Sequence, residues 1–407
     1  MSQHIEKGSG EMLKLGFDVR DILRGPRLAF SLQRIWIQFV GMTTGYFAYL
    51  FFNYAAYLAA GFDLSATWER YGLLPCLFAG GESVPWYSHL LFGLGSLFLA
   101  IAYLISNTAV ARAAYMLAKG YHFYTWRESF KFAFRKAVSV IFTPLSLGIV
   151  IALMVLGWLA LGLLGRIPVV GELGISLLTP IWLFGALLLL FIAIVAGVSF
   201  LLVPSIIATT DDDAFEAVFQ SFSLTWNQPI RLLLYQIVSL VLSAVSLGVL
   251  ALFVKRSVLI LSGLLGGFMG SDYINLANNG QALLQSWLLM GQNIVESIFR
   301  FGTAPLIYFK HEFIMIPASE LPLSVTISGY LYALGLLFIA GWVLAYGLST
   351  FTTCTMMSYL VLRKNKDNEN LLERKDKEEE QEEPLDKPDE NSTGQVQDSV
   401  TNTEPTT

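Results

Sequence analysis

The sequence predicts an all-α membrane protein, a bundle of about six transmembrane helices with interfacial amphipathic helices. Hydrophobic residues make up 55% of the 407 residues and charged residues only 14%, whereas about a quarter of a soluble domain is charged. Several apolar runs are longer than the roughly 20 residues that a helix needs to cross a bilayer. Runs such as 181–200 are continuously apolar, unlike the alternating strands of a membrane barrel, so the spans are helices.

The apolar runs divide the chain into three parts. Residues 1–34 form a cytoplasmic juxtamembrane segment, 35–362 a polytopic transmembrane domain and 363–407 an acidic tail. The tail holds 7 basic and 14 acidic side chains and too few apolar ones to offset chain entropy, so we expect it to be disordered. The expected spans are about 35–60, 88–111, 139–164, 178–207, 231–254 and 325–362.

The orientation of the spans follows from the basic residues, which favour cytoplasmic loops. Six lie before the first span and six in the connection after the second, but only Arg70 and Arg166 lie after the first and third spans. Both termini are therefore expected in the cytoplasm. The long segment 255–324 carries four basic residues although it should lie outside. Its apolar part, Ser257–Phe268, is expected to be re-entrant or interfacial, with part of a span as the alternative.

Two connections share one local pattern. Thr125–Glu128 and Asp213–Glu216 both resemble capping boxes, in which the first side chain and the Glu each bond the other residue's amide. Each precedes an apolar-rich helical segment that leads into the next span. The pattern suggests a pseudo-repeat of span, interfacial helix and span. Real duplication and coincidence both remain open.

Acidic residues cluster at one place outside the tail: Asp211, Asp212, Asp213 and Glu216. Hard divalent cations bind several carboxylate oxygens, so a metal site is one interpretation. Acidic side chains are also favourable at a helix N-terminus. We expect this second, structural role and no metal site.

The sequence contains no catalytic or cofactor motif. P-loop, dinucleotide-binding and nucleophile-elbow patterns are missing, and no His or Cys spacing fits zinc. Cys76 and Cys354 are not expected to form a disulfide. The cores of the expected spans carry no charged side chain, which disfavours an ion-coupled transporter. Asn53 and Gln236 are the polar groups there that we expect to bond between helices.

Two further segments have a packing signature. Gly41 and Gly45 form a GxxxG pattern, which favours close helix packing within the monomer or dimerisation. Residues 281–302 form an amphipathic helix with Leu284 and Trp287 on its apolar face. We expect that helix to lie on the membrane surface or cap the bundle, with partner docking as the alternative.

Several stretches carry a family resemblance: 206–224 followed by Pro229 and Tyr235, 109–112, 126–128 and 359–363. Together they resemble a family of uncharacterised multi-pass inner-membrane proteins of bacteria such as planctomycetes. The resemblance covers roughly 20–370. It implies a bacterial inner (plasma) membrane location and supplies no activity.

These features favour a non-enzymatic integral membrane protein, a scaffold or a subunit of a membrane assembly. The alternative is a transporter or permease subunit for an uncharged or lipid-like substrate, and a membrane enzyme acting on lipid is a third option. The expected partners are the lipid bilayer and a membrane protein or second copy, with no nucleic acid and no cofactor.

Overall fold

The structure is a computed structural model that describes residues 12–75, 84–299 and 322–374. Six of its helices are long and apolar enough to cross a membrane, and the described residues form no strand. The predicted all-α membrane fold is confirmed. The six are α3 (Leu32–Ala59), α5 (Trp86–Ala118), α7 (Ala137–Leu164), α9 (Thr179–Thr210), α11 (Pro229–Met269) and α14 (Leu323–Asp367).

Shorter helices connect these spans. Each of α3, α7 and α11 is preceded by short helical segments, and further short helices lie between the two spans of a pair. The short helices are α1 (Val19–Ile22), α2 (Gly25–Ala29), α4 (Leu64–Tyr71), α6 (Trp126–Arg135), α8 (Val170–Leu177) and α10 (Ala214–Asn227), and the longer α12 (Ser271–Phe299) follows α11.

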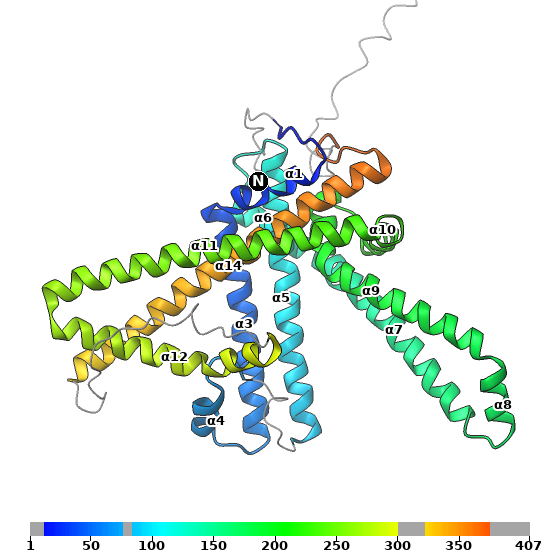
Figure 1. The fold of residues 1–407 in the computed structure, drawn as a ribbon, viewed down its shortest axis with the longest axis horizontal. Coiled ribbons are helices and arrows are strands. Elements are labelled where there is room, and N and C mark those ends of the chain that lie inside the picture. The colour runs from blue at the N-terminus through cyan, green and yellow to red at the C-terminus, as the bar shows by residue number, and fades with distance from the viewer. Residues whose placement is uncertain (1–11, 76–83, 300–321, 375–407) are drawn as a thin grey trace, which may run out of the picture.

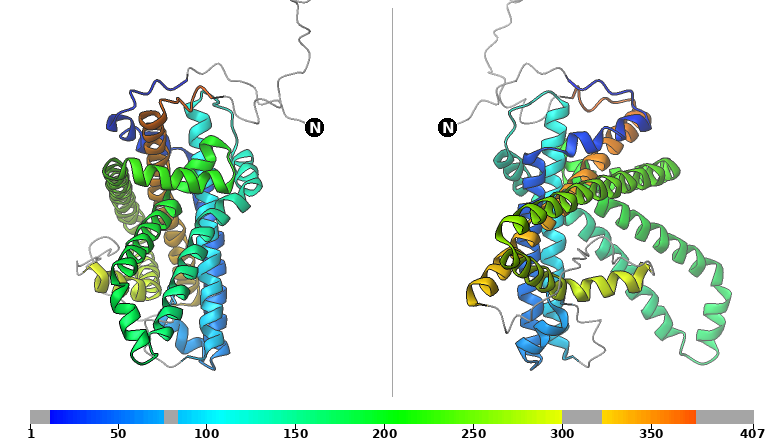
Figure 2. Two further views of the ribbon diagram at one scale, coloured as in Figure 1. Left: turned by 90° about the vertical axis from the view of Figure 1, so that its right-hand side faces the viewer. Right: turned by 60° about the vertical axis from the view of Figure 1, so that its left-hand side comes forward.

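The long helices form three hairpins: α3 with α5, α7 with α9, and α11 with α14. The hairpins meet at one end and diverge from it, as Figures 1 and 2 show. The C-terminal parts of α5, α9 and α14 contact one another at that end, which we call the shared end. The N-terminal segment α1 also packs there against α14, so both described termini lie at the shared end.

The core of the molecule lies at the shared end. Nearly every residue of 104–118, 202–211 and 349–362 is buried. Small residues such as Ala109, Ala208 and Ser349 are common in these stretches, and small side chains let membrane helices approach closely. Away from the shared end, most large apolar side chains are exposed, as expected of surfaces that face lipid.

Helix α11 corrects one prediction. Ser257–Phe268 is neither re-entrant nor a separate interfacial segment, because α11 continues through it to Met269. No Pro interrupts this stretch, and the helix ends only at Gly270, whose φ of 65° is favourable for glycine. The helix is 41 residues long and runs across α3 and α5 rather than along them (Figure 1).

Helix α12 contains the described part of the predicted amphipathic helix, but it begins ten residues earlier, at Ser271. It packs against α14 and α4. Leu284 is buried in a cluster with Val258 of α11 and Leu336 of α14, and the Trp287 carbonyl accepts a 2.9 Å hydrogen bond from the Leu73 amide. Packing against the bundle, rather than lying free on a membrane, therefore accounts for its apolar face up to residue 288.

The GxxxG pattern packs within the monomer. A side chain at Gly41 would collide with Ser106, and one at Gly45 would collide with Ala102. Both partners lie on α5, the other helix of the hairpin. The two glycines therefore account for the close contact between α3 and α5, and this interpretation of the pattern is confirmed.

Candidate functional site

Polar and charged side chains gather at the shared end, around the C-terminal parts of α5, α9 and α14. The most deeply buried is Arg112, which is fully enclosed. It is the first of the six basic residues that follow the predicted second span, 88–111, but α5 extends past it to Ala118. Its guanidinium donates a 3.0 Å hydrogen bond to the Ala208 carbonyl of α9 and lies 4.3 Å from the ring centre of Phe132 on α6. Arg112 therefore joins three helices.

The two predicted capping boxes have different outcomes. Thr125 and Glu128 form the box at the start of α6, with the Glu128 carboxylate accepting from the Thr125 amide at 2.6 Å. Asp213 occupies the N-cap of α10, but its side chain makes no capping bond. The second box is wrong because both of its carboxylates have other partners nearby. Asp213 lies 3.9 Å from Lys136, and Glu216 accepts from Gln220.

The described carboxylates of the acidic cluster are not arranged around a metal-ion position. Asp211 is almost buried and lies 2.8 Å from the ammonium of Lys136, at the junction of α6 and α7. Asp212 lies 3.7 Å from Arg374, beyond the end of α14. No group of three or more His, Cys, Asp or Glu among the described residues is placed to hold a metal ion. The cluster instead contacts cationic side chains from other elements.

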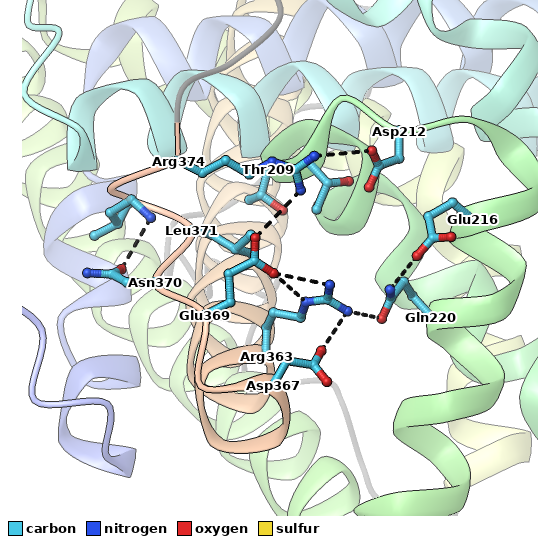
Figure 3. A network of polar contacts seen from close by, with 12 residues as sticks. Thr209, Asp212, Glu216, Gln220, Arg363, Asp367, Glu369, Asn370, Leu371 and Arg374 are labelled. Carbon is cyan, nitrogen blue, oxygen red and sulfur yellow. Dashed lines mark hydrogen bonds and ion pairs between the residues drawn. The ribbon is translucent and has the colours of Figure 1, made fainter.

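A second group of charges surrounds the end of α14, as Figure 3 shows. Arg363 lies 2.8 Å from Asp367 and 3.2 Å from Glu369. Its guanidinium also donates to Gln220 of α10, which is itself bonded to Glu216. One arginine thus links the end of α14, the turn that follows it and the α10 helix.

The chain beyond α14 folds back onto the shared end. Leu371 and Leu372 are buried, and the Tyr115 hydroxyl donates a 2.7 Å hydrogen bond to the Leu371 carbonyl. The Lys119 ammonium donates to the Arg374 carbonyl at 2.8 Å. The predicted start of disorder at 363 is therefore wrong for residues 363–374. The rest of the predicted disordered tail, 375–407, lies outside the described residues.

Polar contacts continue along the helices below this end. Thr352 of α14 donates a 3.0 Å hydrogen bond to the Asn107 amide oxygen of α5. Gln236 bonds Thr355 between α11 and α14 at 3.4 Å, as expected, whereas Asn53 bonds the Tyr49 carbonyl within its own helix. The Thr352–Asn107 and Thr355–Gln236 bonds therefore link helices that the shared end already holds together.

Charged residues do occur inside the long helices, because these helices extend beyond the predicted spans, whose cores carry none. Arg34 lies in the first turn of α3 and is 6% exposed. Its Nε has no hydrogen-bond partner among the described residues. Lys255 and Arg256 lie within α11. The sequence pattern of apolar runs locates span centres, and it misses charges in the flanking turns.

The remaining titratable candidates do not form a site. Cys354 is a free, buried thiol beside the Ile22 carbonyl, and Cys76 lies outside the described residues. At the opposite end of the molecule, hydrogen bonds from Ser65 and from the Ala66 amide lower the pKa of Asp63, which caps α4. That carboxylate has a structural role at the start of its helix.

An apolar groove of about 370 Å³ lies between the start of α3, the middle of α11 and the middle of α14. Its lining includes Ile35, Leu250 and Trp342, and Ser31 contributes a polar group. Such a surface fits an apolar chain. It offers no arrangement of nucleophile, acid and base.

The ion pairs described at the shared end join helix ends to one another. The described side chains there form no metal-binding group, and we identify no arrangement of nucleophile, acid and base among them. In comparisons with known proteins, no family model, no curated protein sequence and no solved structure matches this chain.

Proposed function

We propose that this protein is a non-enzymatic component of a membrane assembly, a scaffold or subunit. Its location is the bacterial inner membrane, as the family resemblance implies, and both termini are cytoplasmic. The orientation rests on the basic residues of the N-terminal segment. Support also comes from the shared end, where the described termini meet.

The observation that carries the proposal is the contrast between the two ends of the molecule. Ion pairs and buried small residues hold the helices together at the shared end. The α7–α9 hairpin then diverges from α3 and α5 (Figure 1), and only 6% of the most apolar stretch of α7 is buried. A closely packed end with diverging apolar hairpins offers long helix faces to the spans of a partner protein.

A second candidate is a transporter or permease subunit for a lipid-like substrate. The apolar groove between α3, α11 and α14 favours it, because an acyl chain fits such a lining. Against it stands the position of the polar side chains. They bond helix to helix at the shared end, as Thr352 does to Asn107, and the described groove is lined mainly by apolar residues.

The experiment that separates the two candidates measures mass and cross-linking in mild detergent. A photoreactive residue replaces Leu156, which is 59% exposed on α7, and a matched one replaces Phe47, 64% exposed on α3. We expect native mass spectrometry to give a complex of fixed stoichiometry. The Leu156 probe should cross-link to a protein subunit that the mass spectrum also finds in this complex.

A lone 45.1 kDa chain, with lipid as the cross-linked species at both positions, contradicts the assembly role. Accelerated transfer of a fluorescent phospholipid between leaflets of vesicles that contain the lone chain then supports the transporter.

A further inference from the structure

Helix α6 has three distinct faces. At about 100° per residue, Ser129, Phe132 and Ala133 share one side, and all three are buried. They pack toward α5, where the guanidinium of Arg112 lies over the Phe132 ring. This side fixes how the helix is rotated, so the positions of the other two faces follow from it.

The second face is aromatic. Trp126, Phe130 and Phe134 recur every four residues, and their rings contact one another at centroid distances of 6.4 and 6.1 Å. Trp126 is 40% and Phe134 63% exposed. Exposed aromatic side chains on an amphipathic helix are typical of the boundary between headgroups and acyl chains.

The third face is basic and adjoins the aromatic one. Arg127, Lys131 and Arg135 also recur every four residues, and all three are exposed. Arg127 and Lys131 form no ion pair among the described residues, and Arg127 lies 5.3 Å from the Trp126 ring centre. The nearby acid, Glu128, is held in the capping box at the start of the helix. Arg127 and Lys131 therefore lack a fixed anion among the described residues.

Helix α10 occupies the corresponding place before α11 and provides a comparison. It also carries exposed aromatic residues four apart, Phe215 and Phe219, and a further one at Trp226. However, it contains no Lys or Arg. The two helices share the aromatic face, and only α6 has the basic face beside it.

We propose that the basic face of α6 is a binding site for anionic phospholipid headgroups. The aromatic face sets the helix at the level of the headgroups, and Arg127 and Lys131 then meet the lipid phosphates. A cation at the surface of an anionic membrane contributes about 1 kcal/mol, which is about fivefold in local enrichment. Helix α10 binds the same boundary without selecting lipid by charge.

The test uses the full-length protein in vesicles of three parts phosphatidylcholine to one part phosphatidylglycerol. A photoreactive benzoylphenylalanine replaces Phe134 on α6 or, as the matched control, Phe219 on α10. Mass spectrometry then measures the ratio of the two lipids among the adducts. We expect phosphatidylglycerol to exceed its bulk share at least about threefold at position 134 and to match its bulk share at position 219.

Charge variants show which residues cause the enrichment. R127Q and K131Q should each lower the ratio of phosphatidylglycerol to phosphatidylcholine among the adducts by about two- to fivefold, and salt should lower this ratio as well. R166Q removes an exposed cation between α7 and α8 and should leave it unchanged. Because these substitutions lie at exposed positions, we expect them to leave the melting temperature unchanged. Measuring it checks that each variant is folded.

Two outcomes overturn the proposal. Equal lipid ratios at positions 134 and 219 show that α6 does not select anionic headgroups. Adducts between position 134 and residues 375–407 show that the acidic tail, which carries 11 acidic and 3 basic side chains, occupies the basic face instead.

Discussion

Lys136 places its ammonium 2.8 Å from Oδ1 of Asp211 and donates a second bond of 2.8 Å to the Asp211 carbonyl. Lys136 stands where α7 begins, and Asp211 stands where α9 ends. The pair therefore closes the α7–α9 hairpin at the shared end. Both side chains are largely buried, at 14% and 4% exposure, so water screens the interaction weakly.

The contribution of this ion pair is tested by D211N. Asp211 has a φ of 55°, a left-handed conformation that Asn also tolerates, so the substitution changes the charge without adding backbone strain. We expect a loss of about 2 kcal/mol in the free energy of unfolding, measured as a lower melting temperature in detergent. The double variant D211N/K136M should lose less than the sum of the single variants, and additive losses contradict a direct pair.

The role of Arg112 is tested by R112K, which keeps the charge and removes the flat guanidinium. Lysine cannot both stack on Phe132 and donate in the same plane to the Ala208 carbonyl. We expect a loss of about 1–2 kcal/mol in thermal unfolding. The exposed R127K on α6 is the control and should change stability by less than about 0.5 kcal/mol. Equal effects of the two substitutions rule out a special role for Arg112.

The close contact of α3 and α5 is tested by G41A. The added methyl group would meet Ser106 of α5, and such overpacking costs about 1–3 kcal/mol. Gly148 of α7 faces open space, so G148A should be neutral or slightly stabilising because alanine favours the helix. Melting temperatures of the two variants measure the difference. A neutral G41A would mean that the two helices lie farther apart than described.

The ordered part of the tail is tested by two truncations. Deleting residues 375–407 should leave the melting temperature nearly unchanged, since Leu371, Leu372 and Arg374 keep their contacts. Deleting 368–407 removes two buried leucines and the partners of Tyr115 and Lys119. We expect that truncation to lower stability by about 4 kcal/mol or more, at about 2 kcal/mol for each buried leucine. Similar melting temperatures for both truncations contradict the packing of this turn.

The long apolar runs predicted the helical class and located the six helices that are long and apolar enough to cross a membrane, because in lipid a continuous apolar run leaves the backbone one internally bonded choice. Helix ends were predicted less well. Apolar content falls near Lys255 and after Leu362, yet α11 and α14 continue there. Their backbone bonds are satisfied whether the side chains face lipid, water or protein, so composition does not mark those ends.

The candidate site was less accessible to sequence reasoning. Local patterns predicted the Thr125–Glu128 box correctly, because both partners lie in one turn. They failed for Asp213, because a distant residue, Lys136, competes for the acidic cluster. The bond between Arg363 and Gln220 joins residues 143 positions apart, and no local pattern specifies it. Asp367 and Glu369, the charged partners of Arg363, lie within six residues of it in the sequence. Their proximity is the sequence feature that could have indicated an ion-pair group at this position.

Membrane topology tests the central claim of six spans most directly. Reporter fusions at Gly270, at the turn after α11, and after Arg374 are expressed in a bacterium with paired reporters for each side of the inner membrane. We predict a periplasmic reporter at Gly270, because this turn follows the fifth span from a cytoplasmic N-terminus. We predict a cytoplasmic reporter after Arg374, because both described termini lie at the shared end. A periplasmic reporter after Arg374, together with a cytoplasmic N-terminus, would contradict the six-span arrangement.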